Sequence, residues 1–325
     1  MKPTAHPTAM TRRRLLQAAA GTSIALPALR TLAQPAAREF RIGHQKGTLS
    51  LLKGRGTLEK RLAPLGVSIK WTEFTAGPVQ LEALNVGSID FGDVGEAPPI
   101  FAQAAGAPLA YVAATVPRPK AEGVLLPKGS PIRTVADLRG RKIALNKGSN
   151  VHYFLVKLLE KHGLSYTDVN VVFLPPADAR AAFEKGSIDA WAIWDPFLAS
   201  AEKTLDAQLL ADATGVVNNR AYYFSSLSYA DRNADVLRIA IEEINKVDIW
   251  AKVNRGLLAA ELAPLFGIPK TVLDLSTARA EYGTGPVTAE ILVEQQKIAD
   301  TFYELRLIPK RIQVKDVARS PWSAA

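Results

Sequence analysis

Residues 41–48 read RIGHQKGT and residues 142–149 read KIALNKGS, and this pair of similar stretches decides the fold. In both, an extended stretch is followed by a turn with an amide, a lysine, a glycine and a hydroxyl residue. A second pair follows at nearly the same separation, because GSID occurs at 87–90 and again at 186–189. Matches in the same order at offsets of 101 and 99 residues indicate an internal duplication.

Each copy predicts the order strand, turn, helix, strand, helix, GSID strand, turn, helix. Strands that alternate with helices imply βαβ units and a parallel sheet. The fold class that we predict is therefore α/β, with two similar lobes that each hold a parallel or mixed sheet. Within the copies, glycines at 54 and 56 predict a break in one helix, and Gly87 and Gly186 predict helix ends.

The turns after the first strand of each copy, and those after the GSID strands, lie where an open α/β sheet binds its ligands. Taken singly, a turn such as NKGSN needs no ligand, since Gly and Asn make the turn and Ser or Asn caps the next helix. Each turn also begins a helix, however, and free backbone N–H groups there attract anions. Because the pattern occurs twice, we expect helix N-termini from both lobes to face a cleft that suits a small anion.

The first 33 residues form a separate segment, MKPTAHPTAMTRRRLLQAAAGTSIALPALRTLA. Basic residues precede an apolar stretch that is too short to span a membrane, and small residues at 31–33 suit signal peptidase. TRRRLL resembles a twin-arginine export signal. We therefore expect residues 1–33 to be a signal peptide of the twin-arginine type. A basic tail or an amphipathic helix is the structural alternative.

Composition excludes several classes of function. The 325 residues contain no cysteine, which rules out disulfides, thiol nucleophiles and cysteine metal sites. Five of the 40 lysines and arginines and none of the 31 acids lie in residues 1–33, which leaves 35 basic residues, 31 acidic ones and a net charge of +4. No basic helix with interleaved aromatics appears, so we expect no nucleic-acid partner. The four histidines lack the spacing of a zinc motif, and we expect neither a metal nor a cofactor.

The motifs RIGHQKG, LEALNVGSIDFG, ALNKGSNVHY and FEKGSIDAWAIWDPFLA resemble those of the aliphatic-sulfonate-binding proteins of bacterial ABC importers, over about residues 40 to 310. The resemblance implies a periplasmic-binding-protein fold of type II, in which two crossover strands join lobes that close on the ligand. It implies a non-enzymatic, monomeric protein that collects an alkanesulfonate in the periplasm and delivers it to a permease with a cytoplasmic ATPase. Lobe 1 would comprise residues 34–119 plus 225–325, and lobe 2 residues 120–224.

The repeat and the resemblance together select candidate ligand contacts at the turns and near the second crossover. These are Gln45, Lys46, Gly47, Gly95, Glu96, Ala97, Asn146, Gly148, Ser149, Asn150, Val151, Trp194, Asp195, Asn219 and Tyr282. We expect the backbone N–H groups at 148–151, the Ser149 hydroxyl and the side-chain amides of Gln45 and Asn146 to hold the anion. No full counter-charge is then needed. No histidine is needed, so affinity should be nearly constant from about pH 6 to 8.

Other ligands and one other class of function remain open. Taurine, a sulfate ester, nitrate or a thiamine precursor would suit related binding proteins. An enzyme on the same fold is less favoured, because the chain has no nucleophile elbow, P-loop or dinucleotide fingerprint.

Overall fold

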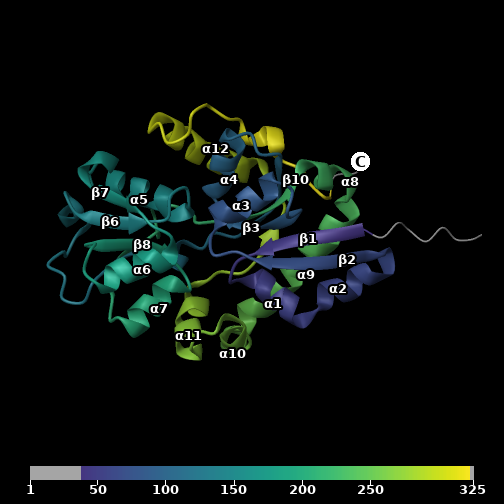
Figure 1. Cartoon of the computed structure of the whole chain (residues 1–325), viewed down its shortest axis with the longest axis horizontal. Helices are drawn as coiled ribbons and strands as arrows, with labels where there is room; N and C mark the ends of the chain where they lie inside the picture. Colours follow the sequence, from purple (N-terminus) through teal and green to yellow (C-terminus); the bar gives the residue numbers. More distant parts are fainter. Residues whose placement is uncertain (1–37, 323–325) are drawn as a thin grey trace, which may run out of the picture. The chain divides into compact units, whose positions relative to one another are not determined.

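Two mixed β-sheets organise residues 38–322, the part of the chain that the computed structural model describes (Figure 1). The predicted signal peptide therefore lies outside the described residues. The six-stranded sheet has the order β11-β4-β10-β3-β1-β2 and the five-stranded sheet the order β7-β6-β8-β5-β9. The strands are β1 (Arg38–His44), β2 (Val67–Glu73), β3 (Phe91–Gly95), β4 (Leu109–Thr115), β5 (Glu122–Leu126), β6 (Lys142–Leu145), β7 (Asn170–Phe173), β8 (Ala190–Trp194), β9 (Gln208–Asp212), β10 (Ala221–Ser226) and β11 (Thr284–Gly285).

The two sheets repeat one plan, as the duplicated motifs predicted. β1 pairs in parallel with β2 and with β3, and β6 pairs in parallel with β7 and with β8. The next strand in each sheet is antiparallel: β10 lies between β3 and β4, and β5 lies between β8 and β9. The predicted fold class, with two similar mixed-sheet lobes, is confirmed.

Twelve α-helices cover the sheets of the described residues. They are α1 (Thr48–Arg55), α2 (Thr57–Leu62), α3 (Gly77–Asn85), α4 (Pro98–Ala104), α5 (Asn150–Lys161), α6 (Pro176–Glu184), α7 (Phe197–Thr204), α8 (Leu227–Arg232), α9 (Ala234–Val253), α10 (Arg255–Phe266), α11 (Lys270–Arg279) and α12 (Ala289–Glu304). The predicted break in the first helix lies at Gly56, whose φ of 61° ends α1 and precedes α2. None of these helices is long and apolar enough to cross a membrane.

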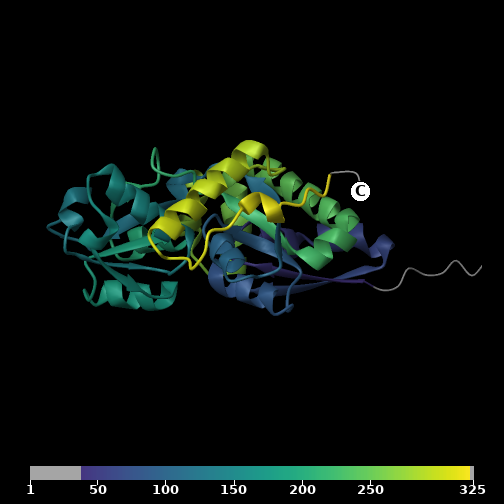
Figure 2. The same cartoon turned by 90° about the horizontal axis from the view of Figure 1, so that it is seen from above.

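Apolar side chains from both faces of each sheet form the cores. Helices α1, α2, α9 and α10 pack on one face of the six-stranded sheet, and α3, α4 and α12 pack on the other. Helix α5 covers one face of the five-stranded sheet, and α6 and α7 cover the other. Figure 2 shows α12, in yellow, extending from the six-stranded sheet towards the five-stranded one, where the rings of Phe302 and His152 lie 5.6 Å apart.

Two crossover segments, 116–121 and 213–220, connect the sheets and lie side by side. Arg118 N donates to Asn218 O at 2.9 Å, and Ala213 N donates to Pro119 O at 3.2 Å. The lobe boundaries themselves stay a prediction. At the level of strands, however, β10 (Ala221–Ser226) pairs within the six-stranded sheet, whereas the predicted range of lobe 2 extended to residue 224.

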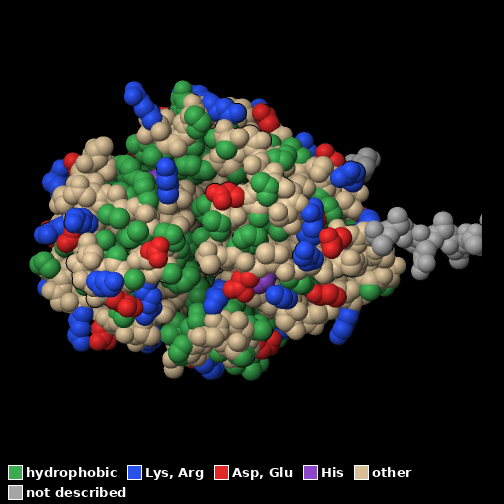
Figure 3. All heavy atoms as spheres, viewed as in Figure 1, with side chains coloured by type: hydrophobic (Ala, Val, Ile, Leu, Met, Phe, Trp, Pro, Cys, Tyr) green, Lys and Arg blue, Asp and Glu red, His purple; other side chains and the backbone are tan. Residues whose placement is uncertain are grey.

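Lysines and arginines are interspersed with acids on the face drawn in Figure 3. No single basic patch dominates that face, which agrees with the small net charge.

Candidate ligand-binding site

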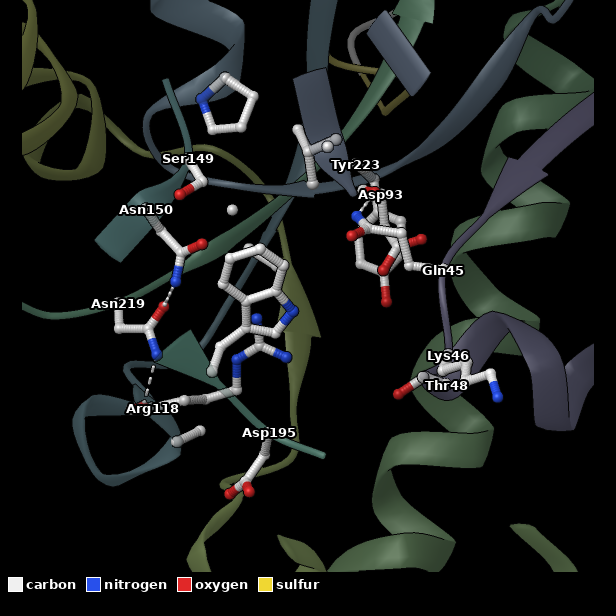
Figure 4. A pocket seen from close by; sticks show the side chains of 18 residues that line it. Gln45, Lys46, Thr48, Asp93, Arg118, Ser149, Asn150, Asp195, Asn219 and Tyr223 are labelled. Carbon is white, nitrogen blue, oxygen red and sulfur yellow. Dashed lines mark hydrogen bonds between the residues drawn. The ribbon is translucent and has the colours of Figure 1, made fainter. Parts of the chain in front are cut away.

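A cavity of about 130 Å³ lies where the two sheets and both crossovers meet (Figure 4). Nine predicted residues line it: Gln45, Lys46, Gly47, Gly95, Ser149, Asn150, Trp194, Asp195 and Asn219. The other lining residues are Thr48, Gly77, Asp93, Val94, Pro98, Arg118, Ala121, Ala221 and Tyr223. Figure 4 shows Ser149, Asn150 and Asn219 on one side, Lys46 and Thr48 on the other, and the side chain of Arg118 between them.

The predicted convergence of helix N-termini is present in this cavity. The first residues of α1, α4 and α5 contribute to its wall, and Asp195 precedes α7. Among the described residues, none accepts a hydrogen bond from the backbone N–H of Asn150 or Val151, although Val151 itself does not line the cavity. The N-terminus of α5 thus offers donors and the positive end of a helix dipole.

Arg118 is the main feature that the sequence analysis missed. It lies in the first crossover, between β4 and a short 3-10 helix at Pro119–Ala121, and its side chain reaches the cavity. No carboxylate of the described residues lies within 4.0 Å of its guanidinium. The cavity therefore contains a full positive charge, whereas the sequence analysis expected neutral donors alone. An arginine between two prolines at the exit of an apolar strand was the available signal.

The turn that begins α5 uses several of its donors internally. Gly148 N–H donates to Nδ1 of His152 at 3.3 Å, and the Ser149 hydroxyl donates to Asn146 O at 2.7 Å. Gly148 has a φ of 72°, the left-handed conformation that glycine adopts readily. These two groups, which the sequence analysis assigned to the anion, stabilise the turn in this structure.

An amide network connects the crossovers to α5. The Asn150 side chain donates to the Glu122 carboxyl and, at 3.1 Å, to the side-chain oxygen of Asn219. Asn219 in turn donates to the backbone oxygen of Arg118 at 3.0 Å. Gly95 completes the contact, because a Cβ there would lie 2.9 Å from the Cβ of Asn150. The network fixes the backbone of Arg118 relative to the N-terminus of α5.

Two carboxyl groups also line the cavity. Burial raises the pKa of Asp93 to about 6 and that of Asp195 to about 7, and the nearby positive charges of Arg118 and Arg279, respectively, oppose these shifts. Asp195 also accepts a hydrogen bond from Ala199 N at 2.9 Å, in the first turn of α7. Both groups change charge near neutral pH.

Gln45 and Lys46 line the cavity but are partly engaged by the protein. Gln45 donates to Asp93 O at 3.1 Å, and the Lys46 ammonium donates to Phe266 O at 2.6 Å, at the end of α10. Lys46 thus interacts with the negative end of a helix dipole. The ammonium contributes to the electrostatic potential in the cavity, but the side chain is directed to Phe266 O and not to the centre of the cavity.

The remaining six predicted residues lie outside the cavity wall: Glu96, Ala97, Asn146, Gly148, Val151 and Tyr282. Glu96 is buried and accepts from Arg220 N at 3.0 Å, and burial raises its pKa to about 7. Tyr282 lines a neighbouring apolar pocket. Ala97 and Val151 are fully buried core residues. The side-chain oxygen of Asn146 is buried with no partner among the described residues.

Both histidines near the site are buried. Burial lowers the pKa of His152 to about 4, and burial also lowers the pKa of His44 below its usual value. Both imidazoles are therefore neutral at pH 7. Within residues 38–322, no cluster of three or more histidines and acids has the arrangement of a metal site.

Comparisons with known proteins place this architecture in context. A family model described as NMT1/THI5 like matches residues 65–246. A protein of Escherichia coli (strain K12) named as an aliphatic sulfonates-binding protein is 40% identical over 306 residues, which cover 93% of this chain and 95% of the relative.

Two solved structures share the fold over most of the chain. The alkanesulfonate-binding protein SsuA from Xanthomonas axonopodis pv. citri, bound to MOPS, has 41% identity and a TM-score of 0.83, covering 87% of this chain and 98% of that one. The periplasmic aliphatic sulphonate binding protein SsuA from Escherichia coli has 42% identity and a TM-score of 0.81, covering 89% and 94%.

Proposed function

Because this chain belongs to the NMT1/THI5-like family, and within it to the aliphatic-sulfonate-binding proteins, we propose that it binds an aliphatic sulfonate in the cavity around Arg118. The observation that carries the proposal is the Arg118 guanidinium, which reaches the cavity and has no carboxylate of residues 38–322 within ion-pair distance. A sulfonate stays ionised at any biological pH and has three acceptor oxygens and no donor. It therefore needs a site rich in N–H groups.

The donors available to the anion come from both lobes. The guanidinium provides a forked set of N–H groups, and the Asn150 backbone N–H adds one at the positive end of α5. Hydrogen bonds to a charged partner contribute about 1.5–3 kcal/mol each. A few such bonds, made as the lobes close, are sufficient for a dissociation constant in the micromolar range or below.

Titration calorimetry on the protein and its Arg118→Gln variant tests this assignment. Ethanesulfonate should bind the natural chain with one ligand per protein, and the variant should bind it at least about tenfold more weakly, because a charge-assisted bond is lost. Arg139→Gln, which removes an exposed arginine paired with Asp168, is the matched control. Tight binding of nitrate or a thiamine precursor, with none of any sulfonate, would assign the protein to a different ligand class.

We also propose that the lobes move about segments 116–121 and 213–220, and that the closed form delivers its ligand to the permease of an ABC importer. The paired crossovers support a common hinge, since hydrogen bonds hold them side by side between the two sheets. The role would be that of a monomeric binding protein without turnover. Incubation with alkanesulfonates should return the ligand unchanged, and release of sulfite would instead indicate an enzyme.

For location we propose the periplasm, reached through the twin-arginine route. The support is TRRRLL at residues 11–16, ahead of a weak apolar stretch. Replacement of Arg12 and Arg13 by lysine should leave the precursor in the cytoplasm. Mature protein in the periplasm of a strain that lacks the twin-arginine translocase would contradict this route.

A further inference from the structure

Two buried glutamates, one next to each sheet, lie beside the first residue of α5, and neither lines the anion cavity. Glu96 follows β3 of the six-stranded sheet and is 3% exposed, whereas Glu122 begins β5 of the five-stranded sheet and is fully buried. A Cβ on Gly95, the residue before Glu96, would lie 2.9 Å from the Cβ of Asn150, and the Asn150 side chain donates to Glu122. Asn150 thus contacts both segments at the junction of the sheets.

Each of the two carboxyl groups has one bonded oxygen and one oxygen without a partner. Glu96 Oε2 accepts from Arg220 N at 3.0 Å, and Glu122 Oε2 accepts from the Asn150 side chain. Oε1 of each glutamate is buried and has no hydrogen-bond partner among the described residues. A buried carboxylate oxygen without a donor is costly, and a protonated carboxyl group provides an O–H donor. One bound proton therefore supplies what the pair lacks.

The arginines near the pair direct their guanidinium groups elsewhere. That of Arg220 donates to Glu294 and to Thr115 O, both at 2.9 Å, and that of Arg118 reaches the anion cavity. Within residues 38–322, no guanidinium donates a hydrogen bond to either glutamate. The charged and titratable groups that face the pair are Arg118, Arg220, Glu294, Lys297, Tyr153 and Tyr222.

The acidity of the two glutamates agrees with a retained proton. Burial raises the pKa of Glu96 to about 7, although the backbone N–H and the positive charge of Arg220 oppose this shift. Burial and the negative charge of Glu96 raise the pKa of Glu122 well above its usual value. Two carboxyl groups that disfavour each other's ionisation lose their protons in two separate steps. The pair therefore keeps one proton through the neutral range.

We propose that Glu96 and Glu122 share one proton at the junction of the two sheets and act as positioning residues for the anion site. The proton lets one glutamate donate to the other, so the carboxyl groups attract each other across the junction. Glu122 then holds the Asn150 side chain, which donates to Asn219, and Asn219 donates to the backbone oxygen of Arg118. The positioning role rests on the proposed function, whereas the shared proton does not.

Denaturant unfolding at several pH values tests for the shared proton. Both glutamates are ionised in the unfolded chain at neutral pH, so the folded chain binds one proton more and loses stability as the pH rises. Glu96→Gln and Glu122→Gln each replace the protonated acid by an amide donor. Relative to either variant, the unfolding equilibrium constant of the natural chain should increase up to about tenfold per pH unit, between about pH 7 and 9.

Two results would overturn the sharing of the proton. The first is an unfolding profile of the natural chain that runs parallel to those of both variants. The second is a loss of stability that persists in Glu96→Gln and disappears only in Glu122→Gln, because Glu122 would then hold its proton alone. Glu82→Gln is the matched control, since Glu82 is exposed on α3, and this variant should keep the profile of the natural chain.

Calorimetry with ethanesulfonate near neutral pH tests the positioning role. Glu122→Ala removes the acceptor of the Asn150 side chain and should weaken binding at least about tenfold. Glu122→Gln keeps an acceptor oxygen and should restore most of that loss. Equal affinity of Glu122→Ala and the natural chain would show that the pair does not position the site. Failure of the natural chain to bind any sulfonate would refute the proposed function, and the unfolding profiles would still decide whether the proton is shared.

Discussion

Asp93 and Asp195 bring two carboxyl groups into a cavity that we expect to hold an anion. Their raised pKa values, about 6 and about 7, mean that both are partly protonated near neutral pH. A protonated carboxyl does not repel a sulfonate, whereas a carboxylate does. Asp93 and Asp195 should therefore make the affinity for the anion depend on pH, whereas the neutral histidines should not.

Affinity for a sulfonate should therefore fall as the pH rises from 6 to 8, by about tenfold, or about 1.4 kcal/mol. This replaces the constant affinity expected from the sequence. Asp195→Asn should remove most of the dependence, and calorimetry at several pH values measures it. A dependence that persists in Asp195→Asn but disappears in His152→Phe would assign the proton to the imidazole instead.

Gly95 allows β3 to approach α5 closely, so a side chain there should separate them. In Gly95→Ala the new Cβ would lie 2.9 Å from the Cβ of Asn150, and overpacking of this kind costs about 1–3 kcal/mol. We expect a lower melting temperature and weaker ligand binding. Gly256→Ala, which meets no atom within 4 Å, is the control and should be neutral or stabilising. Equal stability of the two variants would show that β3 and α5 move apart at residue 95 at little cost in free energy.

Residue contacts were harder to predict than residue positions. The duplicated turns placed Gln45 and Asn150 at the cavity because chain order fixes which turns follow parallel strands. They did not reveal that the Ser149 hydroxyl bonds Asn146 O, since that depends on a rotamer. Arg118 was missed because it lies in a crossover and outside the repeat, where no periodic pattern marks it.

At the scale of elements, α5 combines a ligand-facing N-terminus with a buried histidine in its first turn. His152 is packed among aromatic rings, including Phe101 and Phe302. Its ring bonds Gly148 N–H on one side and lies 2.8 Å from the Tyr166 hydroxyl on the other. A neutral imidazole satisfies both contacts, so the helix start depends on the protonation state of this residue.

Stability should decrease on acidification through His152. Its pKa of about 4 lies below the usual 6.5, so the unfolded chain binds a proton in this range and the folded chain does not. The associated stability is complete above pH 6.5, and up to about 3 kcal/mol of it is lost as the pH falls towards 4.

Denaturant unfolding of the natural chain and of His152→Phe, between pH 4 and 7, isolates this contribution. The buried carboxyls with raised pKa values change stability in the opposite direction, but they do so in both proteins. The difference between the two free energies of unfolding should therefore narrow or reverse at low pH. A constant difference would mean that the pKa of His152 is the same in the folded and unfolded states.

The elements themselves were largely predictable. Gly56, Gly87 and Gly186 all have positive φ, so the chain reversals lie where glycine was present to allow them. The assignment of β10 was less exact, because this strand follows the second copy of the repeat in the chain but joins the sheet of the first copy, and the repeat does not predict that change of sheet.

At the scale of the whole described region, the two sheets are held together at more than the crossovers. Arg279 at the end of α11 lies 3.9 Å from Asp195 and 2.5 Å from Glu202 on α7. The amide network of Asn150, Asn219 and the Arg118 carbonyl, by contrast, connects α5 to the crossovers themselves. Opening of the lobes would break the Arg279 pairs, whereas the amide network lies close to the segments that we propose as the hinge.

Asn219 should be sensitive to backbone strain as well as to lost hydrogen bonds. Its φ of 49° is left-handed, which glycine adopts freely and alanine does not. Asn219→Gly and Asn219→Ala both lose the amide network and should bind a sulfonate more weakly. Asn219→Ala should also be less stable than Asn219→Gly, by about 1–2 kcal/mol in denaturant unfolding. Equal stabilities would show that the crossover relaxes without strain.

The placement of β10 in the six-stranded sheet has a consequence for synthesis. The five-stranded sheet is built from residues 122–212, which emerge from the ribosome as one continuous segment. The six-stranded sheet begins earlier but lacks its central strand until β10 has been made, because β3 and β4 do not pair with each other. The half of the protein that is translated first is therefore completed last, and its exposed sheet edges must remain unpaired while the second half is already able to fold.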